Sequence, residues 1–304
     1  MYGLMVGAVE YGLVYALMAL GVFITFRILN FPDLTVDGSF TTGAAVATVA
    51  TVSGTPPWLS IIFAFAAGAL AGTCTGLLHT KGKINGLLSG IIMMIALYSI
   101  NLRILGKPNY PFRDTETLFS SSNVLLVMIV IVIVVKLLLD LFFRTNIGLS
   151  LRATGDNPKM IRSFGANTDM TIIMGVALSN ALVGASGAFV SHYLKYADNG
   201  MGVGMIVIGL ASVIIGEAIF GSRSIFKATI AAILGSIIYR MITALAVYVD
   251  WLDASDMKLI TAIIVIFALV IPYMRSVSKQ KSVARKRTSE LLSSSTGEQI
   301  GGGR

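Results

Sequence analysis

Two carboxylates and two hydroxyls alternate within one short segment, "NFPDLTVDGSF" (residues 30–40). They belong to Asp33, Thr35, Asp37 and Ser39. Side-chain oxygens at this spacing could bind a polar solute, or they could cap the start of a helix. Pro32 and Gly38 disfavour a continuous helix, so we expect irregular backbone around the two carboxylates.

Arg240 lies deep within an apolar segment. It follows Lys227 by thirteen residues, which is about 20 Å along a helix. The side chain is then too deep in an apolar segment to reach the inner membrane surface easily. We expect either an internal ion pair, for example with Asp33 or Asp37, or a cation presented to a substrate carboxylate.

Two further polar residues lie within apolar segments. Glu217 is about one turn from the end of its segment, where it could pair with Arg223 or Lys227 or gate the inner mouth of a pathway. Asn180 lies in "GVALSNALVGASGAF" (residues 175–189), whose small residues favour close helix packing. The same stretch could instead line a substrate path with backbone and hydroxyl groups.

The elements that must position these residues are apolar helices. The chain of 304 residues is 55% hydrophobic and only 12% charged, whereas soluble domains are about 25% charged. Long uncharged runs are typical of membrane-spanning helices. We predict an all-α, polytopic membrane helix bundle of about 8–9 transmembrane helices with a cytoplasmic coupling helix. The predicted segments are 11–28, 40–52, 61–78, 87–102, 124–143, 171–191, 203–220, 228–249 and 259–273.

Basic residues set the predicted orientation. A bundle domain (residues 1–275) precedes a basic tail (residues 276–304) that is too polar to fold alone. Positive charge favours the cytoplasm, so the C-terminus and the loop 144–170 are predicted to lie inside a bacterial cell membrane. The irregular segment 30–40 then lies at membrane depth, buried or beside a water-filled cavity, or it forms a cytoplasmic turn in which Asp37 caps the next helix. The basic residues are not interleaved with aromatic residues, so nucleic acid is not an expected partner.

The loop 144–170 carries the signals of a short, capped helix. Asp156 or Asn157 suits the N-cap, Pro158 the first helical position and Gly165 the position after the helix. The helix would be amphipathic and lie at the inner membrane surface. It could rest on lipid or fit a groove on a soluble partner. The residues assigned to it are Asn157, Pro158, Lys159, Ile161, Arg162, Phe164 and Gly165.

The stretch "IGLSLRATGDNPKMIRSFGANTDM" resembles the coupling-helix loop of ABC importer permeases in the branched-chain amino acid and ribose permease superfamily. "YALMALGVFITFRILNFPDLTVDGSFTTGAA" resembles the first span of that family, and "GMGVGMIVIGLASVIIGEAIFGSRSIFKATIAAILGSIIY" resembles its glycine-rich pair of spans. The resemblance covers most of residues 10–275. It is closest to a less characterised subgroup that works with a lipoprotein or a periplasmic solute-binding protein.

The resemblance implies a permease subunit that forms a translocation pathway and dimerises, as a homodimer or with a related subunit. It also implies an ATPase subunit on the coupling helix and a solute-binding protein outside the cell. The sequence lacks a G-x-x-x-x-G-K-[ST] phosphate loop, so we expect no enzyme activity and no cofactor here, with Mg-ATP held by the partner. Asp33, Thr35, Asp37, Ser39, Asn180 and Arg240 are then the predicted pathway residues.

The segment 30–40 departs from the family pattern. The branched-chain amino acid branch carries Ala-His-Gly after Asn-Phe, whereas this chain carries Pro-Asp-Leu-Thr-Val-Asp-Gly. An amino acid is the favoured cargo, and a sugar or nucleoside comes second. The alternative class is a secondary transporter or channel driven by an ion gradient, which embedded acidic residues would also suit.

Overall fold

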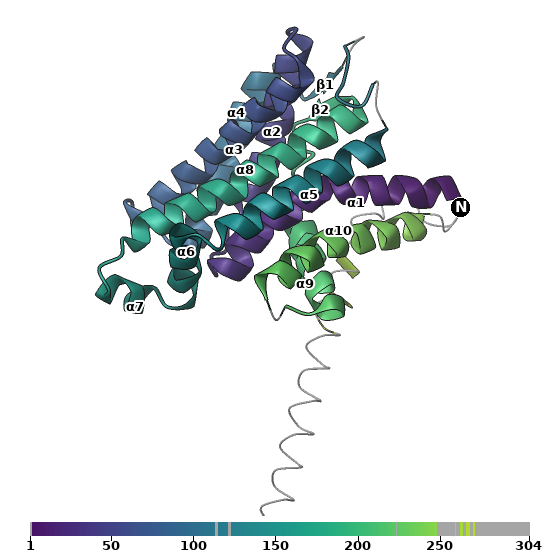
Figure 1. The fold of residues 1–304 in the computed structure, drawn as a ribbon. Coiled ribbons are helices and arrows are strands. Elements are labelled where there is room, and N and C mark those ends of the chain that lie inside the picture. Colours follow the sequence, from purple (N-terminus) through teal and green to yellow (C-terminus); the bar gives the residue numbers. More distant parts are fainter. Residues whose placement is uncertain are drawn as a thin grey trace, which may run out of the picture.

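The computed structural model describes residues 2–112, 115–120, 123–222 and 224–247, together with six isolated helical residues between 259 and 270. The predicted segment 259–273 lies mostly outside these described residues, and the tail 276–304 lies wholly outside them. The described helices are α1 (Tyr2–Val22), η1 (Phe23–Ile28, a π-helix that continues α1), α2 (Thr35–Val52), α3 (Pro57–Thr80), α4 (Gly86–Leu105), α5 (Val124–Phe142), α6 (Asn146–Asp156), α7 (Pro158–Ser163), α8 (Thr168–Leu194), α9 (Met205–Phe220) and α10 (Ile225–Val247) (Figure 1).

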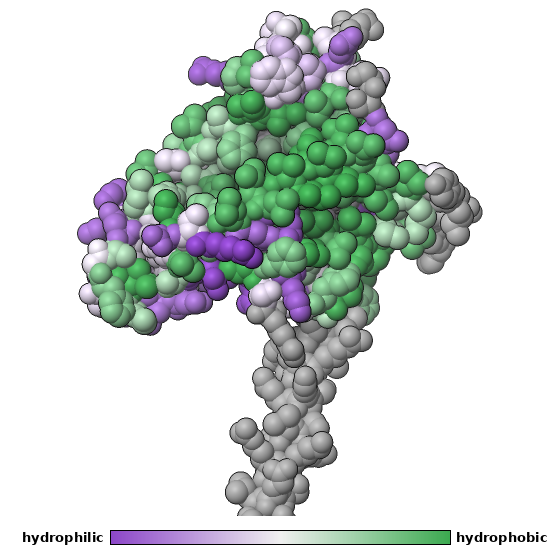
Figure 2. Space-filling view, in the orientation of Figure 1, coloured by the Kyte–Doolittle hydropathy of each residue, from purple (hydrophilic) through white to green (hydrophobic). Residues whose placement is uncertain are grey.

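The helices form an all-α membrane bundle. Six of those described are long and apolar enough to cross a membrane: α1 with η1, α3, α4, α5, α8 and α10. Figure 2 shows a broad hydrophobic belt over α5, with hydrophilic residues gathered at the two ends of the bundle. Leu126, Leu138 and Leu141 of α5 are each at least 60% exposed, as expected for side chains that face lipid acyl chains.

Helices α2 and α9 differ from the long spans. The sequence predicted a segment from residue 40, but α2 begins at Thr35 and lies among α3, α4 and α8, with most of its residues buried. A helix surrounded by protein can carry threonines and a carboxylate in its first turns, which is why apolarity alone placed its start too late. Helix α9 has 16 residues and begins after an irregular stretch, as α2 does.

Small residues bring the central helix α8 close to its neighbours. Gly43 of α2 meets Gly184, and Gly68 and Gly72 of α3 meet the α8 backbone at Asn180 and Val176. A Cβ atom at any of these three glycines of α2 and α3 would overlap a backbone oxygen of α8. Close backbone approach of this kind is how membrane helices gain packing energy without a hydrophobic driving force between them.

The chain contains an inverted repeat that sequence inspection did not reveal. Asn30 and Asp33 of the first repeat correspond to Lys195 and Asp198 of the second repeat, each 165 residues further along the chain. Asn30 and Lys195 both adopt positive φ, at 52° and 59°, a conformation uncommon for residues other than glycine. Asp33 accepts a hydrogen bond from the backbone two residues on, at 2.9 Å, and Asp198 does the same at 2.7 Å. The two long helices α1 and α8 therefore end in the same turn.

Helix contacts follow the same relation. Val22 of α1 packs on Gly209 of α9. Their counterparts at the same spacing of 165 residues are Gly187 of α8 and Ala44 of α2, and these two residues are also in contact. Helices α1 and α8 are antiparallel, since Ser186 donates to the carbonyl of Val14 and residues later in α1 face residues earlier in α8. The repeats thus have opposite directions, which is the organisation of many transporters.

A two-stranded sheet closes one end of the bundle, opposite α6 and α7 (Figure 1). Strand β1 (Asn109–Pro111) pairs antiparallel with β2 (Tyr196–Asp198), with Tyr110 opposite Ala197. Strand β2 is the segment that joins α8 to the irregular stretch before α9. The sheet therefore joins the end of α4 to the stretch that leads into α9.

Candidate pathway and coupling sites

Asp33 lies in a closed polar cluster inside the bundle. Its side chain is 1% exposed, and its Oδ2 accepts a hydrogen bond from Asn180 Nδ2 of α8 at 2.6 Å. Its Oδ1 accepts from the backbone of Thr35, whose hydroxyl bonds to Thr75 of α3 at 2.7 Å. The backbone is irregular around Asp33, as predicted, but the prediction is wrong for Asp37 and Gly38, which lie in the first turn of α2. The structure brings together three of the predicted pathway residues, Asp33, Thr35 and Asn180.

Asp37 joins α2 to α9. Its Oδ2 accepts from the backbone N–H of Gly204 at 2.9 Å, and its Oδ1 accepts from that of Ile206 at 2.8 Å. The carboxylate therefore caps α9, where the helix dipole favours a negative charge. The alternative prediction that Asp37 caps its own helix is wrong, because the donors come from the second repeat.

The structure separates Ser39 and Arg240 from this cluster. Ser39 is fully buried in α2. Arg240 lies over the ring of Tyr15, with 3.7 Å between the guanidinium carbon and the ring centroid. A salt bridge to Asp33 or Asp37 is not present, because each acid has other partners and the arginine packs on α1 instead. The predicted pair with Asp33 or Asp37 is wrong, while an ion pair with another acid of the chain and the role of Arg240 towards a cargo carboxylate stay predictions.

Glu217 is paired at the opposite end of the bundle from the sheet. Its Oε1 accepts from Nε of Arg27 in η1 at 3.0 Å. The predicted pairing of Glu217 with Lys227 is wrong, and the other predicted partner, Arg223, lies outside the described residues. The pair joins the end of α1 to the end of α9, beside a cavity of about 170 Å³ that is also lined by Arg152 and Asp156 of α6.

The loop 144–170 folds into two helices at the same end. Asn157 caps α7, since its Oδ1 accepts from the backbone of Met160 at 3.1 Å, and Pro158 is the first helical residue. Gly165 follows the helix with a φ of 83°. The predicted caps are therefore confirmed. Helix α6 packs against the end of η1, where Gly155 touches the carbonyl of Ile28.

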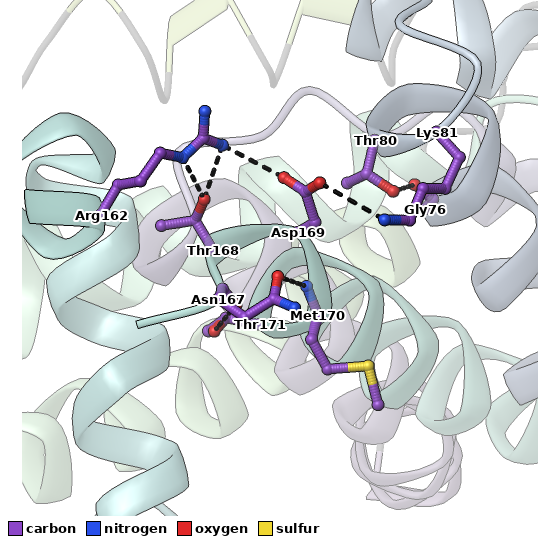
Figure 3. Close-up of polar contacts among 9 residues, drawn as sticks. All are labelled: Gly76, Thr80, Lys81, Arg162, Asn167, Thr168, Asp169, Met170 and Thr171. Carbon is purple, nitrogen blue, oxygen red and sulfur yellow. Dashed lines mark hydrogen bonds and ion pairs between the residues drawn. The ribbon is translucent and has the colours of Figure 1, made fainter. Parts of the chain in front are cut away.

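An ionic network fixes α7 to the bundle (Figure 3). The guanidinium of Arg162 bonds to the hydroxyl of Thr168 at 2.7 Å and to Asp169 at 3.1 Å. Asp169 also lies 3.8 Å from Lys81 at the end of α3. Arg162 therefore has partners within its own chain, and its contribution is to hold α7 in place.

The outer surface of α7 is free within the described part of the chain. Phe164 is 76% exposed and Met160 is 52% exposed, and Lys159 is also exposed, while Ile161 is partly covered. Two large apolar side chains thus project from the polar end of the bundle. Such anchors are typical of a helix that fits a groove on a partner.

The lipid-facing belt, the broken helices joined by Asp37 and the projecting helix α7 define a membrane transport protein. Residues 4–270 match the family described as branched-chain amino acid transport system, permease component, and the chain belongs to this family. It is the permease component of an ABC importer, a subunit that is not itself catalytic.

Individual relatives agree with this assignment. The chain is 42% identical over 255 residues to the tyrosine transport system permease protein of Clostridioides difficile (strain R20291), covering 84% of this chain and 86% of that protein. It is 29% identical over 200 residues to a probable branched-chain amino acid transport permease protein of Methanocaldococcus jannaschii, covering 60% and 63%. One solved structure, an inward-facing conformation of a metal-chelate type ABC transporter, also matches, with a TM-score of 0.48 and 16% identity, covering 90% of this chain and 85% of that chain; this likeness carries no part of the assignment.

Three residues of these sites were missed by sequence reasoning. Arg27 falls within the predicted segment 11–28, and neither it nor Asn101 and Asn199 was singled out. Asn101 is a polar residue in the apolar run of α4, which was an available signal. Nothing local in the sequence distinguishes Asn199 or Arg27, since their partners are about a hundred or more residues away.

Proposed function

We propose that this permease moves an amino acid across a bacterial cell membrane as one half of a homodimer. A solute-binding protein would deliver the cargo, and an ATPase subunit would dock on α7. Two relatives are named as permeases for tyrosine and for branched-chain amino acids, which supports an amino acid over a sugar or nucleoside. Two equal docking grooves on an ATPase dimer would match two copies of α7 related by twofold symmetry.

The exposed side chain of Phe164 is the observation that carries the coupling proposal. Helix α7 is short, and its own contacts to the bundle are polar, through Arg162, Thr168 and Asp169. Its apolar side chains point away and would gain energy by burial in a partner. Movement of α7 would reach the pathway through α6 and the end of η1.

The proposed orientation places α6 and α7 in the cytoplasm. Basic side chains gather at that end of the bundle: Lys81, Arg144, Arg152, Lys159 and Arg162. A cytoplasmic excess of positive charge is the usual arrangement. With eight described helices in the predicted positions and a ninth predicted from residue 259, the N-terminus would lie outside and the C-terminus inside.

The docking role predicts a large effect of Phe164→Ala. The permease should fold and span the membrane normally, but its affinity for the ATPase subunit should fall on the order of 30-fold, because truncation of a central aromatic anchor has effects of that size. The measurement is the binding of purified ATPase subunit to permease in nanodiscs. The mass of the wild-type complex should also correspond to two permease copies.

Phe63→Ala is the matched control, because Phe63 is 45% exposed on α3 and faces lipid in the proposed orientation. It should leave ATPase binding unchanged. Normal binding by Phe164→Ala would contradict the docking role. Uptake that persists without ATP but collapses with the ion gradient would instead support the rival secondary transporter.

We further propose that Arg27 and Glu217 form the inner gate, since their ion pair joins the two repeats at the coupling end. Arg27→Glu and Glu217→Arg should each raise cargo-independent ATPase activity of the complex about two- to fivefold, because Arg27 is largely exposed and a solvated ion pair closes the gate only modestly. The double charge exchange should restore the basal rate. Additive effects of the two changes would contradict the gate.

A further inference from the structure

A cavity of about 330 Å³ opens between α2, α4 and the irregular stretch before α9. Asp37 lies in its wall, together with Asn101 of α4 and Asn199 of the stretch that follows β2. Both repeats therefore contribute to the cavity. Substrate sites of transporters built from inverted repeats commonly lie where the repeats meet, beside interrupted helices.

Asn101, in the wall of this cavity, has an unused acceptor. The side chain is 1% exposed, and its Nδ2 donates to the carbonyl of Gly38 at 3.2 Å. Since a carbonyl oxygen only accepts, this bond fixes the orientation of the amide. Its Oδ1 is buried and has no hydrogen-bond partner within the described residues.

Asn199 repeats the arrangement on the other side. It is 5% exposed, and its Nδ2 donates to the carbonyl of Tyr98 at 3.4 Å. Its Oδ1 also lacks a hydrogen-bond partner in the described part of the chain. Buried polar atoms are almost always paired, so two unpaired acceptors around one cavity point to a bound group that donates.

Asp37 adds charge to these acceptors. Each of its carboxylate oxygens accepts one backbone donor of α9, which leaves further lone pairs on both oxygens. The cavity therefore offers a carboxylate and two amide oxygens, all of which accept. An ammonium group, with three donors and no acceptor, is complementary to such a set.

The remaining wall suits an apolar or aromatic side chain. Met94 and Ile95 of α4 and Val203 line it, together with the ring of Tyr98. Tyr98 is 56% exposed and Val203 is 65% exposed, so the mouth opens on the outer surface of this chain. A carboxylate that opens towards lipid is costly, and this face therefore belongs beside an aqueous path.

We propose that this cavity binds the α-ammonium group of the amino acid cargo, with Asp37, Asn101 and Asn199 as its acceptors. The inference rests on the proposed amino acid function and names the residues that select the cargo. It assigns no role to α7, so it can fail while the coupling role stands.

Ser99 allows a direct test, because it lines the cavity and is exposed. In a Cys74→Ser background, which removes the single native cysteine, Ser99→Cys places a thiol there by a one-atom change. The full-chain permease in nanodiscs is treated with a cationic ethylammonium thiosulfonate or an anionic sulfonatoethyl thiosulfonate. The ratio of the cation's reaction rate to the anion's should be about tenfold higher for this thiol than for a small thiol in buffer.

Asp37→Asn should remove this charge preference, whereas Asp156→Asn, a matched change at the coupling end, should keep it. Saturating L-tyrosine should slow the modification about fivefold, and 3-(4-hydroxyphenyl)propionate, which lacks the ammonium group, should not. The protection should disappear in Asn199→Ala and, separately, in Asn101→Ala.

Three results would overturn the inference. They are equal protection by the two ligands, protection that survives both asparagine changes, and no protection by L-tyrosine or L-leucine in a permease that still binds its ATPase subunit. The last result would show that water alone fills the cavity, and it would leave the coupling role intact. Loss of ATPase binding by the unmodified chain would instead contradict the proposed function.

Discussion

Gly43→Ala should strongly destabilise the bundle, although it adds a single methyl group. Gly43 lies where α2 crosses α8, and a Cβ atom there would overlap the carbonyl group of Gly184. The obstacle is backbone rather than a flexible side chain, so the two helices must separate. Overpacking of this kind costs about 1–3 kcal/mol or more, and separated helices also lose the neighbouring contact of Gly187 with α2.

Gly7→Ala is the matched control, because Gly7 is also helical but has no atom within 4 Å of an added Cβ. It should be neutral or stabilise by about 0.5–1 kcal/mol through reduced backbone entropy. Thermal unfolding in detergent, followed by the loss of monodisperse protein, compares the two variants. Equal unfolding temperatures for Gly43→Ala and the wild type would show that α2 and α8 are not tightly packed at this crossing.

Local chemistry made the helices and caps predictable. The apolar segments from residues 61, 87 and 124 correspond to α3, α4 and α5, because a lipid-facing helix must be apolar along its whole length. The cap formed by Asn157, Pro158 and Gly165 was predictable for a similar reason, since these residues satisfy the ends of their own helix. The start of α2 was misplaced because its surroundings are protein rather than lipid.

Long-range partners were not predictable in the same way. The charge of Glu217 suggested a partner nearby in the sequence, but Arg27 is 190 residues away. Asp37 was expected near the pathway from its own segment, and its donors come from the second repeat. The repeat itself is nearly invisible in the sequence: "NFPD" and "KYAD" share only the aspartate and an aromatic residue, because the common feature is a backbone conformation.

Asn180→Leu should destabilise the bundle strongly by removing the amide donor that Asn180 gives to Asp33. Leucine has a similar volume, so the packing is largely kept. The hydrogen bond between Asn180 and Asp33 measures 2.6 Å and is fully buried, and a bond to a charged group contributes about 1.5–3 kcal/mol. An uncompensated carboxylate away from water costs more still.

Asp33→Asn completes a double-mutant cycle. Alone, it should destabilise moderately, because the new amide can place an N–H donor against the Nδ2 donor of Asn180. Asn180 Nδ2 also donates to the carbonyl of Val176, which holds the Asn180 amide in its present orientation. In the Asn180→Leu background the same change should restore part of the stability, since no buried charge then remains. A coupling of about 0.5–3 kcal/mol is expected for residues in direct contact, measured as thermal or denaturant unfolding in lipid nanodiscs.

The same cycle separates a positioning role from a pathway role for Asp33. If the cluster positions the segment that carries Asp37, uptake by each variant should fall in proportion to its loss of folded protein, and the double variant should regain both. If Asp33 contacts the cargo, Asp33→Asn should abolish uptake in protein that remains folded, and Asn180→Leu should not rescue it. We expect the first result, because Asp33 is 1% exposed and bonds to α8 and to the backbone at Thr35, whereas Asp37 lines a cavity.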